Sequence, residues 1–193
     1  VAYQRQQSLH VDWLDAEEAK ARWPWLGPVR GAFWAPAGGG VDPQRLVEAL
    51  RADAVRLGAT HIPDRAVAIE RHGDRAAAVL GKERHPATDV VLAAGAWSAL
   101  IEGLPRPLAV APVRGEMAAL PAPEGVGRSI VYGKGAYIMG RGDEVTVGST
   151  MDYAGFHNEV TAAGLAKIFA GASQICPALA RAPVLRTWSG LRP

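Results

Sequence analysis

The side chains that most often carry chemistry are scattered through this 193-residue sequence. The five histidines have no HxH, HxxxH or HExxH spacing, so they do not predict a metal site. They are His10, His61, His72, His85 and His157. Ser98 lies outside a GxSxG motif and Ser149 has no histidine placed to pair with it, so a hydrolase triad is not predicted. The single cysteine, Cys176, excludes an internal disulfide, and we expect it to be packed rather than reactive.

Two glycine-rich stretches could cradle phosphate groups, but neither has the required sequence. Gly133-Lys134-Gly135 and Gly140-Arg141-Gly142 do not continue into GxGxxG, and neither opens a helix. The apolar stretch 90–98 is more informative, because it predicts a buried strand ending in Ala-Ala-Gly. Such an end exposes backbone at the edge where open α/β sheets bind ligands. The same small residues would also suit a plain turn from a strand into a helix.

A second set of residues could bind a carboxylate. Arg192 offers a planar guanidinium, and the stretch 137–141 adds the Tyr137 hydroxyl and a second guanidinium from Arg141. Alone, an arginine such as Arg192 is more often solvated than part of a binding site.

The first half of the chain predicts helices and an open sheet. Asp15 and Glu18 form a capping box for a helix over 16–23, and Asp42 with Pro43 opens an amphipathic helix over 43–57. We expect the second helix to lie on a sheet. Strands are expected at 66–70, 76–80 and 88–93, the last apolar on both faces. This order predicts the second half of an open α/β sheet.

The second half of the chain, after the proline-rich segment 105–112, predicts an antiparallel sheet with one helix. The helix has Thr161 as its N-cap. The expected strands are 113–120, 129–132, 136–139, 144–148 and 184–188.

The composition is that of a globular protein, with 49% hydrophobic and 21% charged residues. A net charge of +2 without a basic run argues against a dedicated nucleic-acid binder. The longest apolar run, 90–101, is too short for a membrane span, and the sequence starts without a signal-peptide core. We therefore expect a cytoplasmic protein. The missing initiator methionine suggests part of a longer one.

The motifs, in their order, resemble the FAD-dependent oxidoreductases of the D-amino-acid oxidase superfamily, most closely its glycine oxidase branch. The matching stretches are Gly38–Pro43, Val91–Ser98, Pro112–Met117, Tyr137–Arg141, Val147–Met151, Gly155–Phe156 and Trp188–Pro193. The family's N-terminal GxGxxG segment, its ribose-binding acid and its C-terminal segment along the flavin are missing. The resemblance therefore implies the central part of such an enzyme.

The fold implied by this resemblance is α/β plus α+β. It combines a partial FAD/NAD(P)-binding, Rossmann-like sheet with an antiparallel substrate-domain sheet flanked by helices. Residues 1–37 would be a segment of the substrate domain and a linker. Residues 38–104 would be a partial FAD-binding domain, and residues 105–193 a truncated substrate-binding domain.

The resemblance also implies where FAD and the substrate bind. Val67 would lie in the strand whose backbone touches the adenine of FAD. The residues lining the path of FAD across the sheet would be Ala94, Gly95 and Trp97. Those contacting the substrate would be Arg192 on its carboxylate, Tyr137 through a hydrogen bond, and Met151 as a wall of the pocket.

The activity implied is the oxidation of a small amino acid or amine, such as glycine, sarcosine or a D-amino acid. The substrate's Cα hydride would pass to the flavin, and the imine would be hydrolysed to an oxo acid. Dioxygen would then be reduced to peroxide. We expect no catalytic side chain, because the flavin does the chemistry. The alternatives are a D-amino-acid dehydrogenase with another electron acceptor and an isolated fragment unable to hold FAD. Exposed strand edges would favour a homo-oligomer.

Overall fold

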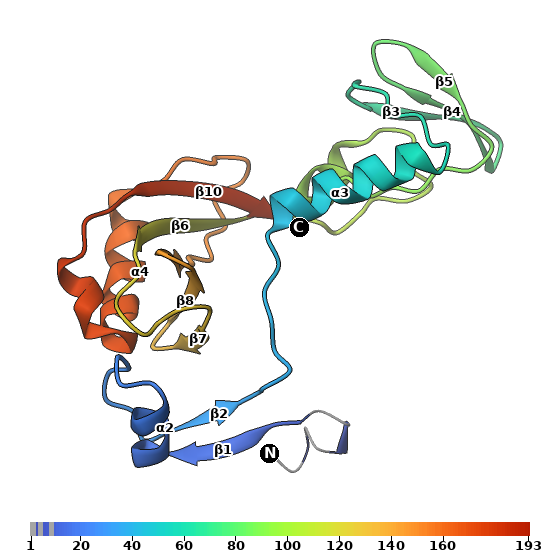
Figure 1. Cartoon of the computed structure of the whole chain (residues 1–193). Coiled ribbons are helices and arrows are strands. Elements are labelled where there is room, and N and C mark those ends of the chain that lie inside the picture. The colour runs from blue at the N-terminus through green and yellow to red at the C-terminus, as the bar shows by residue number, and fades with distance from the viewer. Residues whose placement is uncertain (1–2, 4–5, 8–9) are drawn as a thin grey trace. The chain divides into compact units, whose positions relative to one another are not determined.

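The computed structural model describes residues 3, 6–7 and 10–193, which form two compact units (Figure 1). The first unit contains the described residues up to Gly40, together with Arg114–Asp152 and His157–Gly190. The second contains Val41–Val113, Tyr153–Phe156 and Leu191–Pro193. Both units mix helices with antiparallel strands, so the predicted mixed α/β class is confirmed.

A five-stranded sheet in the order β10-β6-β9-β8-β7 dominates the first unit. Its strands are β6 (Val113–Pro121), β7 (Ile130–Gly133), β8 (Ala136–Arg141), β9 (Glu144–Gly148) and β10 (Arg186–Arg192). The pairs β6–β9, β9–β8 and β8–β7 are antiparallel, as predicted. The expected last strand, 184–188, starts and ends later in the structure.

Helix α4 (Ala162–Ile175) packs against this sheet and begins at the predicted N-cap, Thr161 (Figure 1). Ile168 of α4 meets Ile138 and Val147 of the sheet in a fully buried core. Cys176, which follows α4 and precedes the 3-10 helix η2 (Pro177–Arg181), is also fully buried. This burial confirms that the cysteine is packed, and it raises the pKa of the thiol.

The N-terminal part of the first unit contains β1 (Asp12–Asp15), α2 (Ala16–Arg22) and β2 (Gly31–Trp34). The predicted capping box is confirmed: the Asp15 carboxylate accepts from the Glu18 N–H at 2.9 Å, and the Glu18 carboxylate accepts from the Asp15 N–H at 2.9 Å. Strands β1 and β2 were not expected from the sequence, because four residues are too few to show a clear alternation.

The second unit holds helix α3 (Pro43–Arg56) and a three-stranded antiparallel sheet. Its strands are β3 (Ala68–His72), β4 (Arg75–Leu80) and β5 (Arg84–Pro86), followed by the 3-10 helix η1 (Gly95–Leu100). Asp42 caps α3 and the β3–β4 hairpin forms, as predicted. β5 is an additional strand.

Two expectations for the second unit are wrong. No strand forms over 88–93, and Val91 is 91% exposed. The apolar face of α3 does not pack on a sheet, since Leu50 is 60% exposed and no residue of the helix is buried. An apolar run becomes a buried strand only where neighbouring strands pair with it and other elements cover both of its faces. Among the described residues of this unit, the parallel pairing is limited to the single bridge between Ala68 and Glu102.

Among the described residues, no helix has both the length and the apolar character needed to cross a membrane.

Candidate functional site

A cavity of about 680 Å³ in the second unit collects most of the residues predicted to contact the cofactor. Val67, Ala94 and Trp97 line it, and Gly95 directly follows Ala94. Its remaining walls are mainly aliphatic, with Arg65 as the one charged residue in the lining. The volume is in the usual range of small-molecule and cofactor sites.

Val67, which lines the cavity, directly precedes β3, and both polar groups of its backbone are hydrogen-bonded within the unit. Its N–H donates to the carbonyl of Leu80 at 2.8 Å, and its carbonyl accepts from the N–H of Glu102 at 3.0 Å. The N–H is therefore occupied within the unit. A ligand can use the second lone pair of the Val67 carbonyl or the exposed side chain.

Asp64 fixes the turn that brings Arg65 and Val67 to the cavity. Its carboxylate accepts from the N–H of Arg65 at 2.7 Å and from the N–H of Lys82 at 2.8 Å. Burial raises the pKa of the Asp64 carboxyl, but these backbone donors outweigh it, and the pKa lies below its ordinary value. A Cβ on Gly81 would lie 2.4 Å from this carboxylate, so only glycine allows the approach.

The small residues at the other wall leave backbone accessible. Gly95 has a φ of +54°, and a Cβ built there would meet nothing within 4 Å. The chain then turns into η1, where the N–H of Trp97 donates to the carbonyl of Ala94 at 3.1 Å. The Trp97 indole packs against Phe156, with ring centroids 6.2 Å apart.

These walls fit the flat ring systems of FAD, which need apolar faces and a few backbone polar groups. A pyrophosphate is bound best by several cationic side chains or by the N-terminus of a long helix. The lining has one charged side chain, that of Arg65, and the adjoining helix η1 has only six residues. The cavity therefore suits the ring parts of the cofactor better than its phosphates.

Two of the predicted substrate-binding residues lie in the first unit. Tyr137 of β8 is directly opposite Gly148 of β9, and a Cβ on Gly148 would come within 2.9 Å of the Tyr137 hydroxyl oxygen. Met151 follows β9 and is 68% exposed. The third, Arg192, is the last residue of β10 and belongs to the second unit.

Several residues of the site were not predicted from the sequence. Leu100 and Ile101 line the cavity, and Asp64 holds its rim. The first two follow the Ala-Ala-Gly-Ala-Trp stretch as apolar neighbours, which was an available signal. No comparable sequence signal pointed to Asp64, because its hydrogen-bond partner Lys82 is 18 residues away.

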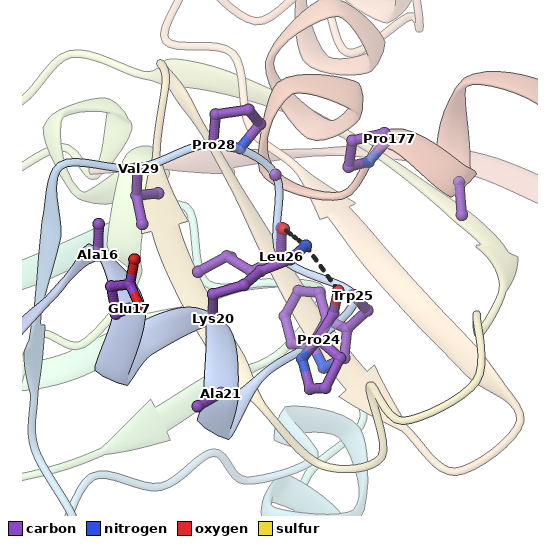
Figure 2. Close-up of a pocket in the computed structure, with 12 residues that line it drawn as sticks. Ala16, Glu17, Lys20, Ala21, Pro24, Trp25, Leu26, Pro28, Val29 and Pro177 are labelled. Atoms are coloured by element: carbon purple, nitrogen blue, oxygen red, sulfur yellow. Dashed lines mark hydrogen bonds between the residues drawn. The ribbon is translucent and has the colours of Figure 1, made fainter.

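A second cavity of about 680 Å³ lies in the first unit, between α2, the loop 24–29 and Pro177 (Figure 2). The Lys20 ammonium donates to the carbonyls of Pro24 and Leu26, both at 2.7 Å, as the dashed lines in Figure 2 show. Lys20 thus ties the loop to α2. None of the predicted site residues lies here.

Comparison with known proteins gives a consistent picture. The whole chain, residues 1–193, matches the DAO family, described as FAD dependent oxidoreductase. The chain is 32% identical over 206 residues to a glycine oxidase of Pseudomonas putida, covering 100% of this chain and 54% of that protein. It is 32% identical over 196 residues to the bifunctional protein ThiO/ThiG of a Synechocystis species, covering 96% of this chain and 29% of that protein.

A solved structure extends this likeness to the fold. The crystal structure of glycine oxidase from Geobacillus kaustophilus matches with a TM-score of 0.89 and 29% identity, covering 100% of this chain and 53% of that one. The chain therefore spans about half the length of the glycine oxidases it matches.

Proposed function

Because this chain belongs to the DAO family of FAD-dependent oxidoreductases, we propose that it serves the FAD-dependent oxidation of a small amino acid or amine. Glycine, sarcosine and D-amino acids are the candidate substrates, with an oxo acid and peroxide as products. The observation that carries the proposal is that Val67, Ala94 and Trp97 line one and the same cavity. Cytoplasmic localisation and homo-oligomer formation stay predictions from the sequence.

In this proposal, residues 38–104 form part of the FAD-binding domain, and Val67, Ala94, Gly95 and Trp97 contact the cofactor. FAD, when bound, supplies the acceptor for the substrate's hydride. The apolar walls of the cavity lie against the rings, and the Gly95 turn keeps side chains out of their way. Residues 1–37 form a segment of the substrate domain and a linker, and residues 105–193 form the substrate-binding domain.

The substrate is oriented by three side chains. The Arg192 guanidinium pairs with its carboxylate, the Tyr137 hydroxyl donates a hydrogen bond to the same group, and Met151 forms a wall. Their task is to orient the substrate, because the rate of hydride transfer depends on the alignment of the Cα–H bond. No side chain is required to act as a base.

The cofactor part is tested by mixing the purified chain with FAD and measuring the flavin absorbance retained after gel filtration. Leucine at Ala94 would project three additional carbon atoms into the cavity, so Ala94→Leu should weaken FAD binding at least about tenfold. Ala52→Leu on the exposed face of α3 is the matched control and should bind FAD like the parent. Equal binding by both variants would contradict the proposal. A colourless parent chain would support a fragment that cannot hold FAD.

The substrate part is tested in the flavin-loaded protein by peroxide formation under air with glycine, sarcosine and D-alanine. Arg192→Ala removes a charged hydrogen bond of about 1.5–3 kcal/mol and should raise KM about 10- to 150-fold. An unchanged KM would remove Arg192 from the site. Reduction of an artificial electron acceptor without peroxide would identify a dehydrogenase instead.

A further inference from the structure

A cluster of charged side chains lies in the first unit, outside the two cavities described above. Glu116 of β6 is 0% exposed, and the side chains of Arg114 and Asp152 are 11% and 39% exposed. The Nη2 atom of Arg114 lies 3.4 Å from Glu116 Oε1 and 3.8 Å from Asp152 Oδ2. Buried charged groups such as Glu116 and Arg114 are retained only with close partners.

Glu116 is held rigidly at the start of α4. Its Oε2 atom accepts from the N–H of Thr161 at 3.0 Å, and its Oε1 atom accepts from the Thr161 hydroxyl at 3.0 Å. That hydroxyl also accepts from the N–H of Gly164 at 3.0 Å. The carboxylate that faces Arg114 therefore has a fixed position.

The short segment Thr150–Asp152 is anchored on β6 at both ends. The N–H of Glu116 donates to the Thr150 hydroxyl oxygen at 3.0 Å. The N–H of Arg114 donates to the Asp152 carbonyl at 2.8 Å, and the N–H of Asp152 donates to the Arg114 carbonyl at 3.0 Å. Thr150 is buried, whereas Met151, between the two anchors, is exposed.

We infer that Arg114 is a positioning residue for Met151. Its backbone pairs with Asp152, and its guanidinium, held by Glu116, faces the Asp152 carboxylate, so the residue after Met151 is fixed through two connections. Met151 is thereby presented as one wall of the amino-acid pocket. This last step rests on the proposed function, whereas the fixing of Met151 does not.

A spin label on the chain measures the fixing directly, without flavin or substrate. The label is placed by Met151→Cys in a Cys176→Ala background, and its mobility is read by electron paramagnetic resonance. Arg114→Leu and Asp152→Asn should both increase the mobility at position 151. Arg114→Lys, which keeps the positive charge on a shorter donor group, should restore most of the order.

Two controls separate positioning from a loss of overall stability. A label introduced by Tyr132→Cys, at an exposed site on β7, should keep its mobility in the same variants. Ile168→Val in the core should destabilise the unit without loosening the label at position 151. If Arg114→Leu does not fold, Asp152→Asn decides, because its side chain is partly exposed. Unchanged mobility at position 151, or equal changes at positions 151 and 132, would overturn the inference.

The consequence for the pocket is measured in the flavin-loaded protein. Asp152→Asn should raise KM for the amino acid several-fold while the affinity for FAD stays unchanged. A parent protein that oxidises no amino acid would refute the proposed function, and the label would still test the fixing of Met151. A loosened label with an unchanged KM would refute the role in the pocket.

Discussion

Replacing Thr161 with alanine should destabilise the first unit by more than the loss of a helix N-cap alone. The Thr161 hydroxyl accepts from the N–H of Gly164 and donates to the buried Glu116 carboxylate, both at 3.0 Å. An N-cap contributes about 0.5–2 kcal/mol. A hydrogen bond to a charged group contributes about 1.5–3 kcal/mol. Thr161→Ala should therefore lower the free energy of unfolding by about 2–5 kcal/mol.

The difference is measured by urea unfolding of the chain, followed by circular dichroism. Thr161→Ser keeps the hydroxyl and should stay within about 1 kcal/mol of the parent. Asp42→Ala removes the N-cap of the exposed helix α3, where the carboxylate accepts from the N–H of Gln44 at 3.0 Å, and should cost about 1 kcal/mol. A loss for Thr161→Ala no larger than that for Asp42→Ala would refute the reasoning.

Three further predictions concern single positions. Gly164→Ala should destabilise the chain by about 1–3 kcal/mol in urea unfolding, although alanine favours helices, because the added Cβ would lie 2.1 Å from a Glu116 oxygen. Gly133→Ala is the control for this first prediction and should be close to neutral, because an added Cβ there would meet nothing within 4 Å. The pKa of the Asp64 carboxyl is lowered in the folded chain, so the carboxylate stabilises the fold above its ordinary pKa, and this stability is lost as pH falls through the folded pKa. Asp64→Asn should therefore flatten the decline of the melting temperature below about pH 4. An unchanged decline would contradict this. Cys176 should react with a thiol reagent far more slowly in the native chain than in urea, and fast native labelling would contradict its burial.

The elements that the sequence predicted best are those fixed by nearby residues. Asp15, Asp42 and Thr161 each cap a helix through hydrogen bonds within three residues, so the signal and the structure lie in the same stretch of chain. β1 depends instead on β2, with Asp12 opposite Trp34. Such a pairing depends on contacts made elsewhere in the chain, and local patterns do not show it.

The functional residues also divide into those that the sequence predicted and those that depend on contacts between distant segments. Motif resemblance named Val67, Ala94 and Trp97, and the structure places all three on one cavity. Glu116 lies inside another matching stretch, but its role follows from Thr161, which is 45 residues further along the chain. Residue type and spacing do not show such a contact, because only the packing of α4 on the sheet creates it.

The strand order of the large sheet has a consequence for synthesis. β7, β8 and β9 are consecutive along the chain and can pair as soon as they leave the ribosome. β10 lies beside β6, where the N–H of Leu185 already reaches the carbonyl of Ala119 at 2.9 Å, but it is translated more than sixty residues later. The nascent chain therefore carries one unpaired side of β6 throughout that interval, and it is most vulnerable to pairing with other chains at this stage.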